Sequence, residues 1–174
     1  DIAAAVLVNP TYQGYSADLA PLVKLFHQKG WPVLVDEAHG SHFASGLDEH
    51  LPASALSAGA DLVVNSLHKS AVGLVQTAVL WLNGEKVDPL AVERSVGWFQ
   101  TTSPSSLLLA SCESALKELR SFSGKKKLIV TIEKAMEINS RLKEKGVPLL
   151  TNEDPLRLVL HSGSVGVSGF EADD

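Results

Sequence analysis

Short apolar runs recur along the first half of the chain and predict buried β-strands. Ala4 to Val8 is an uninterrupted apolar run closed by Asn9-Pro10, which is typical of a strand buried on both faces of a sheet. The fourth run begins seven residues after Lys69 and ends at the turn signal Asn83-Gly84. The four runs occupy residues 4–8, 32–35, 62–64 and 76–82.

Amphipathic segments with helix start and stop signals separate these runs and fill the second half of the chain. Residues 18–29 repeat apolar positions at helical spacing, with Ser16 as the expected N-cap and Gly30 as the stop. A short helix is expected from Ala53 to Ala58, closed by Gly59. Longer helices are expected at residues 89–99, 105–121 and 126–145.

The alternation of strand, helix, strand, helix and strand predicts an α/β fold built on a parallel sheet with right-handed crossovers. A later apolar run at 156–160, which follows Gly146 and Pro148, predicts the first strand of another unit. We therefore expect residues 1–147 to belong to a large domain and residues 148–174 to begin a small C-terminal domain. The first residue is not Met, so we expect the chain to begin within a longer protein.

Composition restricts the classes of function. Of the 174 residues, 45% are hydrophobic and 20% are charged, which is typical of a soluble globular protein. The formal net charge of −5 makes nucleic acid and anionic membranes poor partners, because both attract basic surfaces. No apolar run approaches the ~20 residues that a membrane-spanning helix needs. The single cysteine, Cys112, excludes an intramolecular disulfide and favours a cytoplasmic protein.

Two chemically active side chains follow neighbouring predicted strands. Asp36 directly follows the run at 32–35, and Lys69 comes five residues after the run at 62–64. Ligands bind beyond the carboxyl ends of the strands in an open parallel sheet, so we expect both side chains at one edge. A lysine amine condenses with an aldehyde, and a carboxylate facing a pyridine nitrogen keeps that nitrogen protonated. The spacing of Asp36 and Lys69 alone favours an ordinary surface ion pair. The residues that flank them therefore decide between an ion pair and a cofactor site.

These flanking residues resemble the Orn/Lys/Arg decarboxylase family of fold-type I pyridoxal-phosphate (PLP) enzymes. The resemblance rests on Val35-Asp36-Glu37-Ala38-His39-Gly40 and on Ser66-Leu67-His68-Lys69 downstream. It implies the aspartate-aminotransferase fold, with this chain forming the central and C-terminal part of the large PLP-binding domain. Further segments at 9–14, 59–62, 76–78 and 101–105 follow the order and spacing of the family.

The resemblance implies roles for individual residues around the cofactor. Lys69 would hold PLP as a Schiff base, and Asp36 would pair with the pyridine nitrogen. Ala38 would lie against one face of the ring. Ser66 and His68 would lie at the phosphate and around the Schiff base.

The remaining residues would act on the substrate or across an interface. His39 would lie near the substrate carboxylate or the ring oxygen. The implied catalytic residues are Lys69, His39 and His68, and no metal is implied. Thr101, Thr102 and Ser103 would reach toward the cofactor of a partner subunit. The implied partners are therefore a small amino-acid substrate and a second copy of the chain, in a homodimer or a larger homo-oligomer.

The implied reaction is α-decarboxylation of lysine, arginine or ornithine, as in polyamine biosynthesis. Carbon dioxide leaves, and a histidine or the released lysine protonates Cα. The pattern does not identify the carboxylates for the distal cation of the substrate, for which Glu37 and Asp48 are the candidates. The main phosphate loop of the family, and the residue that stacks on the ring, have no counterpart in this sequence.

Other interpretations stay open at this point. The Asp-Lys pair is common to the whole fold, so aminotransfer or carbon-sulfur lyase chemistry is the alternative, as is a catalytically inactive fragment. Asp36-Glu37-Ala38-His39 also matches a helicase signature, but no Gly-x-x-x-x-Gly-Lys-[Ser/Thr] loop accompanies it. A zinc site is a weaker alternative, because the sequence has neither paired cysteines nor a helical His-Glu-x-x-His motif. That site would draw on His39, His42, His50 and His68 together with Asp36.

Overall fold

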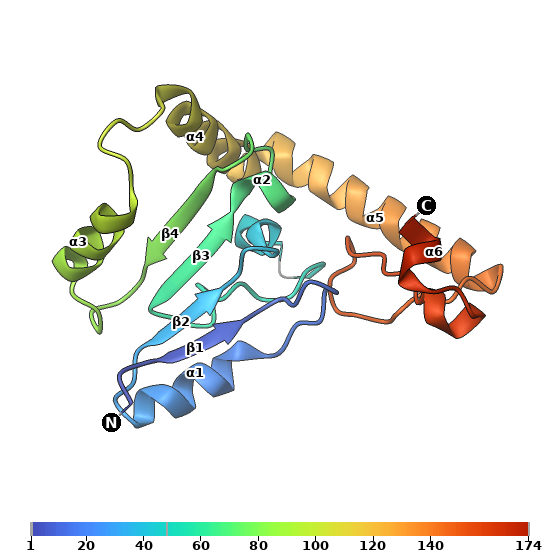
Figure 1. The fold of residues 1–174 in the computed structure, drawn as a ribbon, viewed down its shortest axis with the longest axis horizontal. Coiled ribbons are helices and arrows are strands. Elements are labelled where there is room, and N and C mark those ends of the chain that lie inside the picture. The colour runs from blue at the N-terminus through green and yellow to red at the C-terminus, as the bar shows by residue number, and fades with distance from the viewer. Residues whose placement is uncertain (1, 48, 174) are drawn as a thin grey trace.

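A computed structural model describes residues 2–47 and 49–173 of the protein (Figure 1). Its centre is a four-stranded sheet in the order β1-β2-β3-β4. The first three strands pair in parallel, which confirms the α/β fold and its parallel core. The last strand is antiparallel to β3, because the link at 67–77 is shorter than the dozen residues that a parallel crossover needs. The strands are β1 (Ala5–Val8), β2 (Val33–Asp36), β3 (Leu62–Ser66) and β4 (Ala78–Leu82).

Helix α1 (Leu19–Gln28) connects β1 to β2 and covers one face of the sheet. Leu19 and Val23 on its buried side pack with Val33, Val35 and Val63 of the strands. The expected N-cap at Ser16 is wrong. Asp18 caps the helix by accepting a hydrogen bond from the amide of Ala20, whereas the Ser16 hydroxyl pairs with the side chain of Asn9.

The expectation that β1 is buried on both faces is also wrong for the described residues. Ala5 and Leu7 pack on the core, but Val6 and Val8 on the opposite face are 68% and 62% exposed. Successive strand residues point to opposite faces, so covering one face with α1 leaves every second residue open. This exposed face of β1 therefore presents a strip of apolar surface.

The expected helix at 53–58 is a single turn that does not continue as a helix. The amide of Ala55 donates to Glu37 Oε1 at 2.7 Å, and the amide of Ser57 donates to the hydroxyl of Ser54 at 3.2 Å. Such side-chain partners compete with helical backbone bonds. The chain then turns at Gly59, whose φ of +88° lies in the left-handed region that glycine favours.

A helical layer packs beside the sheet. Helix α5 starts at Phe122, earlier than expected, because Ser121 caps it by accepting from the amide of Gly124. Its buried Ile132 packs with Phe43 of η1 and with Leu51 in a second small core. The elements of this layer are α2 (Leu67–Ser70), α4 (Ser106–Arg120), α5 (Phe122–Glu144) and the 3-10 turn η1 (Ser41–Ser45). Helix α3 (Pro89–Phe99) has no buried residue and lies apart from them, beyond β4 (Figure 1).

The C-terminal segment folds back over the sheet edge and ends in η2 (Ser162–Val165) and α6 (Gly169–Asp173). The expected strand at 156–160 is wrong, because only an isolated bridge joins Leu149 to Leu160. Asp154 redirects the chain, since its side chain accepts from the amide of Leu156 and its carbonyl accepts from that of Arg157. The division at residue 147 stays a prediction. Across the described residues, no helix is long and apolar enough to cross a membrane.

Candidate active site

The carboxyl ends of the parallel strands bring Asp36 and Lys69 to one edge of the sheet. Asp36 is the last residue of β2 and pairs in register with Val64 of β3. Two residues beyond Val64, β3 gives way to α2, which carries Lys69. Asp36 Oδ1 accepts a hydrogen bond from the amide of Ala38 at 3.0 Å, which orients the carboxylate in the turn after β2.

His39 lies between two cationic side chains. Its Nε2 is 3.3 Å from Lys69 Nζ, and its Nδ1 is 3.3 Å from a terminal nitrogen of Arg157. The ring of Tyr12 meets the imidazole edge-on, with the ring centroids 5.1 Å apart. Loops after β1 and β2, helix α2 and the C-terminal segment therefore converge on this histidine.

The charge around His39 favours its neutral form. Burial lowers the pKa of His39 from 6.5, and the positive charges of Lys69 and Arg157 lower it further, against an opposing effect of Asp36. Within the described residues, neither Lys69 nor Arg157 forms an ion pair with a carboxylate. The site thus presents two cationic side chains that form no ion pair with a described carboxylate, next to a neutral imidazole.

Ser66 and His68 occupy the junction between β3 and α2. The carbonyl of Ser66 accepts a hydrogen bond from the hydroxyl of Ser41 at 2.9 Å, while the Ser66 hydroxyl caps no helix amide. His68 Nδ1 lies 3.0 Å from the carbonyl of Thr77. A carbonyl only accepts, so His68 carries a proton on Nδ1 and ties α2 to the start of β4.

Thr101 and Thr102 lie apart from this cluster in the α3–α4 connection, which Figure 1 places beyond β4. Both are exposed, and Thr101 Oγ1 accepts a hydrogen bond from the amide of Ser103 at 3.2 Å. No hydrogen bond joins them to Asp36 or Lys69 in the described part of the chain. Their expected role toward a partner subunit stays a prediction.

A buried polar network supports the site from behind. Glu37 is fully buried, and its two oxygens accept hydrogen bonds from the amide of Ala55 and from Asn65 Nδ2. Asn65 Oδ1 in turn accepts from the indole of Trp81 at 2.8 Å. Glu37 therefore faces the interior and does not fit the distal cation of a substrate. The other candidate for that role, Asp48, lies outside the described residues.

The residues present fit a PLP group. Asp36 forms no ion pair with a described residue and can accept a hydrogen bond from a ring nitrogen. Lys69 is exposed and therefore accessible to an aldehyde. The Ser66 hydroxyl has no described protein partner, which leaves it available to a phosphate oxygen.

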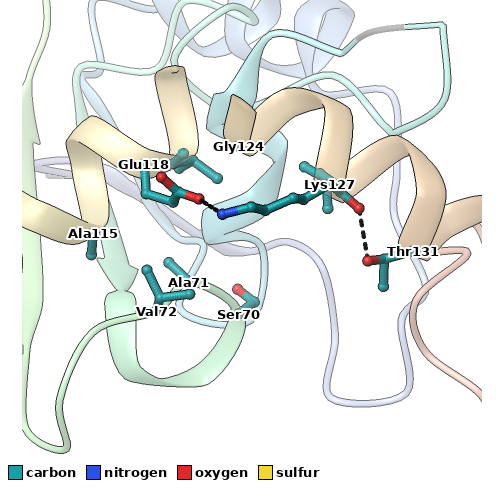
Figure 2. A pocket seen from close by; sticks show the side chains of 10 residues that line it. Ser70, Ala71, Val72, Ala115, Glu118, Gly124, Lys127 and Thr131 are labelled. Atoms are coloured by element: carbon teal, nitrogen blue, oxygen red, sulfur yellow. Dashed lines mark hydrogen bonds and ion pairs between the residues drawn. The ribbon is translucent and has the colours of Figure 1, made fainter. Parts of the chain in front are cut away.

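A hollow of about 160 Å³ lies next to the lysine-bearing segment, between α4, α5 and residues 70–72 (Figure 2). Its charged groups are already paired, since Lys127 Nζ lies 2.6 Å from Glu118 Oε1. The hydroxyl of Thr131 donates to the carbonyl of Lys127 at 2.8 Å. A ligand site needs free polar groups that converge on the ligand, and this hollow lacks them among its lining residues.

The histidines considered for zinc have other neighbours. His42 Nε2 lies 3.1 Å from Asp154 Oδ1 in the interior, and His68 faces the carbonyl of Thr77. In residues 2–47 and 49–173, no three metal-ligating side chains come together.

Sequence reasoning missed Arg157 and Tyr12. Arg157 is 118 positions from His39, and no spacing rule connects the two. Tyr12 lies in the 9–14 segment that carries part of the family resemblance, but the pattern assigned it no role. The Asp154-Pro155 pair is a local signal for a turn at this point, but it does not say where the chain goes next.

Comparisons with known proteins agree with this geometry. Residues 1–160 match the family described as Orn/Lys/Arg decarboxylase, major domain. The chain is 33% identical to an arginine decarboxylase of Bacillus anthracis and 34% identical to one of Bacillus subtilis. Each alignment covers 99% of this chain and 37% of the relative, so the chain spans little more than a third of their length.

Solved structures share the fold. The constitutive lysine decarboxylase of E. coli aligns with a TM-score of 0.64 at 25% identity, over 82% of this chain and 21% of that one. A serine palmitoyltransferase from Sphingomonas wittichii aligns with a TM-score of 0.61 at 26% identity, over 87% of this chain and 37% of that one. The structural comparison therefore points to the same class of α/β fold as the sequence.

Proposed function

Because this chain belongs to the Orn/Lys/Arg decarboxylase family, we propose that it forms part of a PLP-dependent enzyme that removes the α-carboxyl group of a basic amino acid. The observation that carries the proposal is that Asp36 ends β2 and Lys69 lies just beyond the end of the adjacent parallel strand β3, with His39 Nε2 3.3 Å from the lysine nitrogen. Lysine, arginine and ornithine are the substrates to compare, since the named relatives include arginine and lysine decarboxylases.

PLP, when bound, supplies an electron sink for the electron pair that remains on Cα after CO₂ leaves. The residues of this chain provide the rest of the chemistry. Asp36 would accept a hydrogen bond from the pyridine nitrogen and keep its proton in place. Lys69 would attach the cofactor through Nζ, and the Ser66 hydroxyl would bind a phosphate oxygen. His39, held next to Lys69, would carry a proton within reach of the reacting carbon.

We also infer a homodimer or a larger homo-oligomer. Trp98 and Phe99, at the end of α3, are 81% and 90% exposed, and Leu107 and Leu109 of α4 are exposed nearby in sequence. Large apolar side chains that cluster on a surface mark interaction sites. Thr101 and Thr102 lie between these two groups, which supports their expected role toward the cofactor of a partner subunit.

The test is to incubate the chain with PLP, reduce it with borohydride, and map the modified lysines by peptide mass spectrometry. Selective modification of Lys69 is expected, with loss of the label in Lys69→Ala. Lys126→Ala removes another exposed lysine, on the first turns of α5, and should leave the label on Lys69 unchanged. CO₂ release from lysine, arginine and ornithine is then measured on a protein extended at both ends to the length of the relatives.

Two outcomes would contradict the proposal. One is scattered or absent labelling in both the chain and the extended protein. The other is selective labelling of Lys69 with transamination, or with carbon-sulfur cleavage, in place of CO₂ release. The second result would keep the cofactor site and replace the reaction.

A further inference from the structure

The contact between Arg157 and His39 restricts where the imidazole carries its proton. A guanidinium group has donors only, and it stays charged throughout the pH range of proteins. A terminal nitrogen of Arg157 lies 3.3 Å from His39 Nδ1. Because the guanidinium can only donate, Nδ1 accepts this hydrogen bond and therefore carries no proton.

The opposite nitrogen faces the lysine. Burial, Lys69 and Arg157 all lower the pKa of His39 and only Asp36 opposes them, so the ring is neutral near physiological pH. Tyr12 adds a ring edge rather than a charge to this environment. A neutral imidazole has one donor and one acceptor nitrogen, so an accepting Nδ1 leaves the proton on Nε2. His39 Nε2 is 3.3 Å from Lys69 Nζ.

We propose that Arg157 is a positioning residue that fixes the tautomer of His39, so that the Nε2–H is directed at the nitrogen of Lys69. A charged Lys69 has only donors and competes with Arg157 for the single acceptor nitrogen of the imidazole, but Lys69 is exposed on a flexible stem and can turn to water, whereas Arg157 is held in place. The Nε2–H donates to Lys69 once the lysine nitrogen has a free lone pair, which is the form that reacts with an aldehyde. The tautomer itself depends only on residues of this chain. Its use in catalysis rests on the proposed function, where it would place a proton on His39 next to the site of bond cleavage.

The backbone of Arg157 is held in place for this role. Its amide donates to the carbonyl of Asp154 at 3.0 Å, and its carbonyl accepts from Asn152 Nδ2 at 2.8 Å. The buried contact between Asp154 and His42, 3.1 Å long, ties the same turn to η1. The guanidinium also lies 5.8 Å from the ring centre of Tyr12, within cation–π range.

Close packing completes this support. A Cβ on Gly14 would come within 2.8 Å of Arg157 Cβ, so the 11–17 loop approaches the arginine as closely as a glycine allows. Hydrogen bonds, a ring contact and close packing thus hold Arg157 against His39 before any ligand arrives. The arginine is therefore preorganised.

The test is long-range ¹H–¹⁵N NMR of the histidine rings in the ¹⁵N-labelled chain at about pH 7.5, where a histidine with a lowered pKa is neutral. The chain has six histidines, and His39→Gln identifies the signals of interest. We expect the wild type to show a protonated Nε2 and an unprotonated Nδ1 for His39. Arg157→Met should lower the ratio of the Nε2–H to the Nδ1–H form about tenfold, as for a lost charge-assisted hydrogen bond.

Two controls separate positioning from a general structural effect. Arg157→Lys keeps a cationic donor and should retain most of the Nε2–H form. Arg94→Met removes an exposed arginine of α3 and should leave the His39 signals unchanged. A merely structural role of Arg157 would shift many signals without changing the tautomer.

A wild-type chain with its proton on Nδ1, or with a charged ring at this pH, overturns the proposal even if Arg157→Met does not fold. An unchanged tautomer in a folded Arg157→Met chain overturns it as well. No PLP is needed for this measurement. If Lys69 is labelled selectively but the tautomer test fails, only the proposal on Arg157 is wrong. If the tautomer is as expected but Lys69 is not labelled, only the proposed function is wrong.

Discussion

Glu37 and Asn65 are joined by two hydrogen bonds in the interior, directly behind the site. Asn65 Nδ2 donates to the carboxylate of Glu37 at 3.0 Å and to the backbone carbonyl of the same residue at 3.0 Å. Asn65 belongs to β3 and Glu37 follows β2, so this amide connects the ends of the two strands that carry Asp36 and lead to Lys69. Burial raises the pKa of Glu37 to about 7, against hydrogen bonds from Ala55 and Asn65 that lower it.

This raised pKa predicts a pH dependence of stability. Between about pH 4.5 and 7 the folded chain holds a proton that the unfolded chain has released, so Glu37 favours folding below pH 4.5 and loses that contribution as pH rises to 7. The full loss is about 3 kcal/mol. Urea unfolding of the wild type and of Glu37→Gln at about pH 5 and pH 8 measures it, because the variant lacks the titrating group.

Glu133→Gln on the exposed side of α5 is the matched control and should keep the wild-type dependence. If the unfolding free energy changes between the two pH values by the same amount in the wild type and in Glu37→Gln, Glu37 does not titrate in this window.

Gly124 is expected to be essential where α5 approaches the end of α4. A Cβ built at Gly124 would lie 1.8 Å from the carbonyl oxygen of Glu118, so Gly124→Ala should cost about 2 kcal/mol or more of unfolding free energy. Gly97 in α3 has nothing within 4 Å of the same position, so Gly97→Ala should stabilise the chain by up to about 1 kcal/mol. Thermal or urea unfolding of the two variants compares them, and equal effects would contradict the close approach.

The side chain of Asp61 links helix α1 to strand β2, a contact that the sequence patterns did not predict. Its Oδ2 accepts a hydrogen bond from the amide of Val33 at 2.7 Å and lies 2.7 Å from His27 Nε2. Asp61→Ala leaves the buried amide of Val33 without this partner and should cost about 2 kcal/mol in unfolding free energy. His27→Gln removes the more exposed partner and should cost less, so a larger loss in His27→Gln would reverse this assignment.

Asp36→Asn tests the electrostatic part of the proposed function. An amide cannot hold a charged pyridine nitrogen as a carboxylate does, so CO₂ release by the extended protein should fall by about 10² or more. Borohydride labelling of Lys69 should persist, because the lysine itself is intact. Asp18→Asn, which keeps a good N-cap on α1, is the charge-matched control, and similar activity in both variants would argue against the role of Asp36.

Local pattern was sufficient for the parallel strands and the long helices. The runs at 32–35 and 62–64 form β2 and β3, and the segment at 89–99 is α3 as expected. The sequence also predicted which edge of the sheet carries the site, because Asp36 and Lys69 are close in sequence to the ends of these strands. Apolar runs and caps are local signals, so they need no knowledge of distant contacts.

Distant contacts explain the failures. Glu37 pairs with the amide of Ala55 and so helps replace the expected helix at 53–58 with a turn. Asp154 bends the chain where a strand was expected, and it is paired with His42, 112 positions away. Arg157 lies in the turn that Asp154 forms and contacts His39 from there. The sequence therefore placed the histidine in the site but not the arginine.

The folding back of the C-terminal segment limits how relatives can be recombined. A chimera with a crossover point between residues 70 and 150 would combine His39 and Tyr12 of one parent with Arg157 of the other. It would also separate His42 from Asp154 and Gly14 from the arginine that packs on it. Residues 9 to 157 therefore form one unit of exchange, and libraries that shuffle this family should move that block intact.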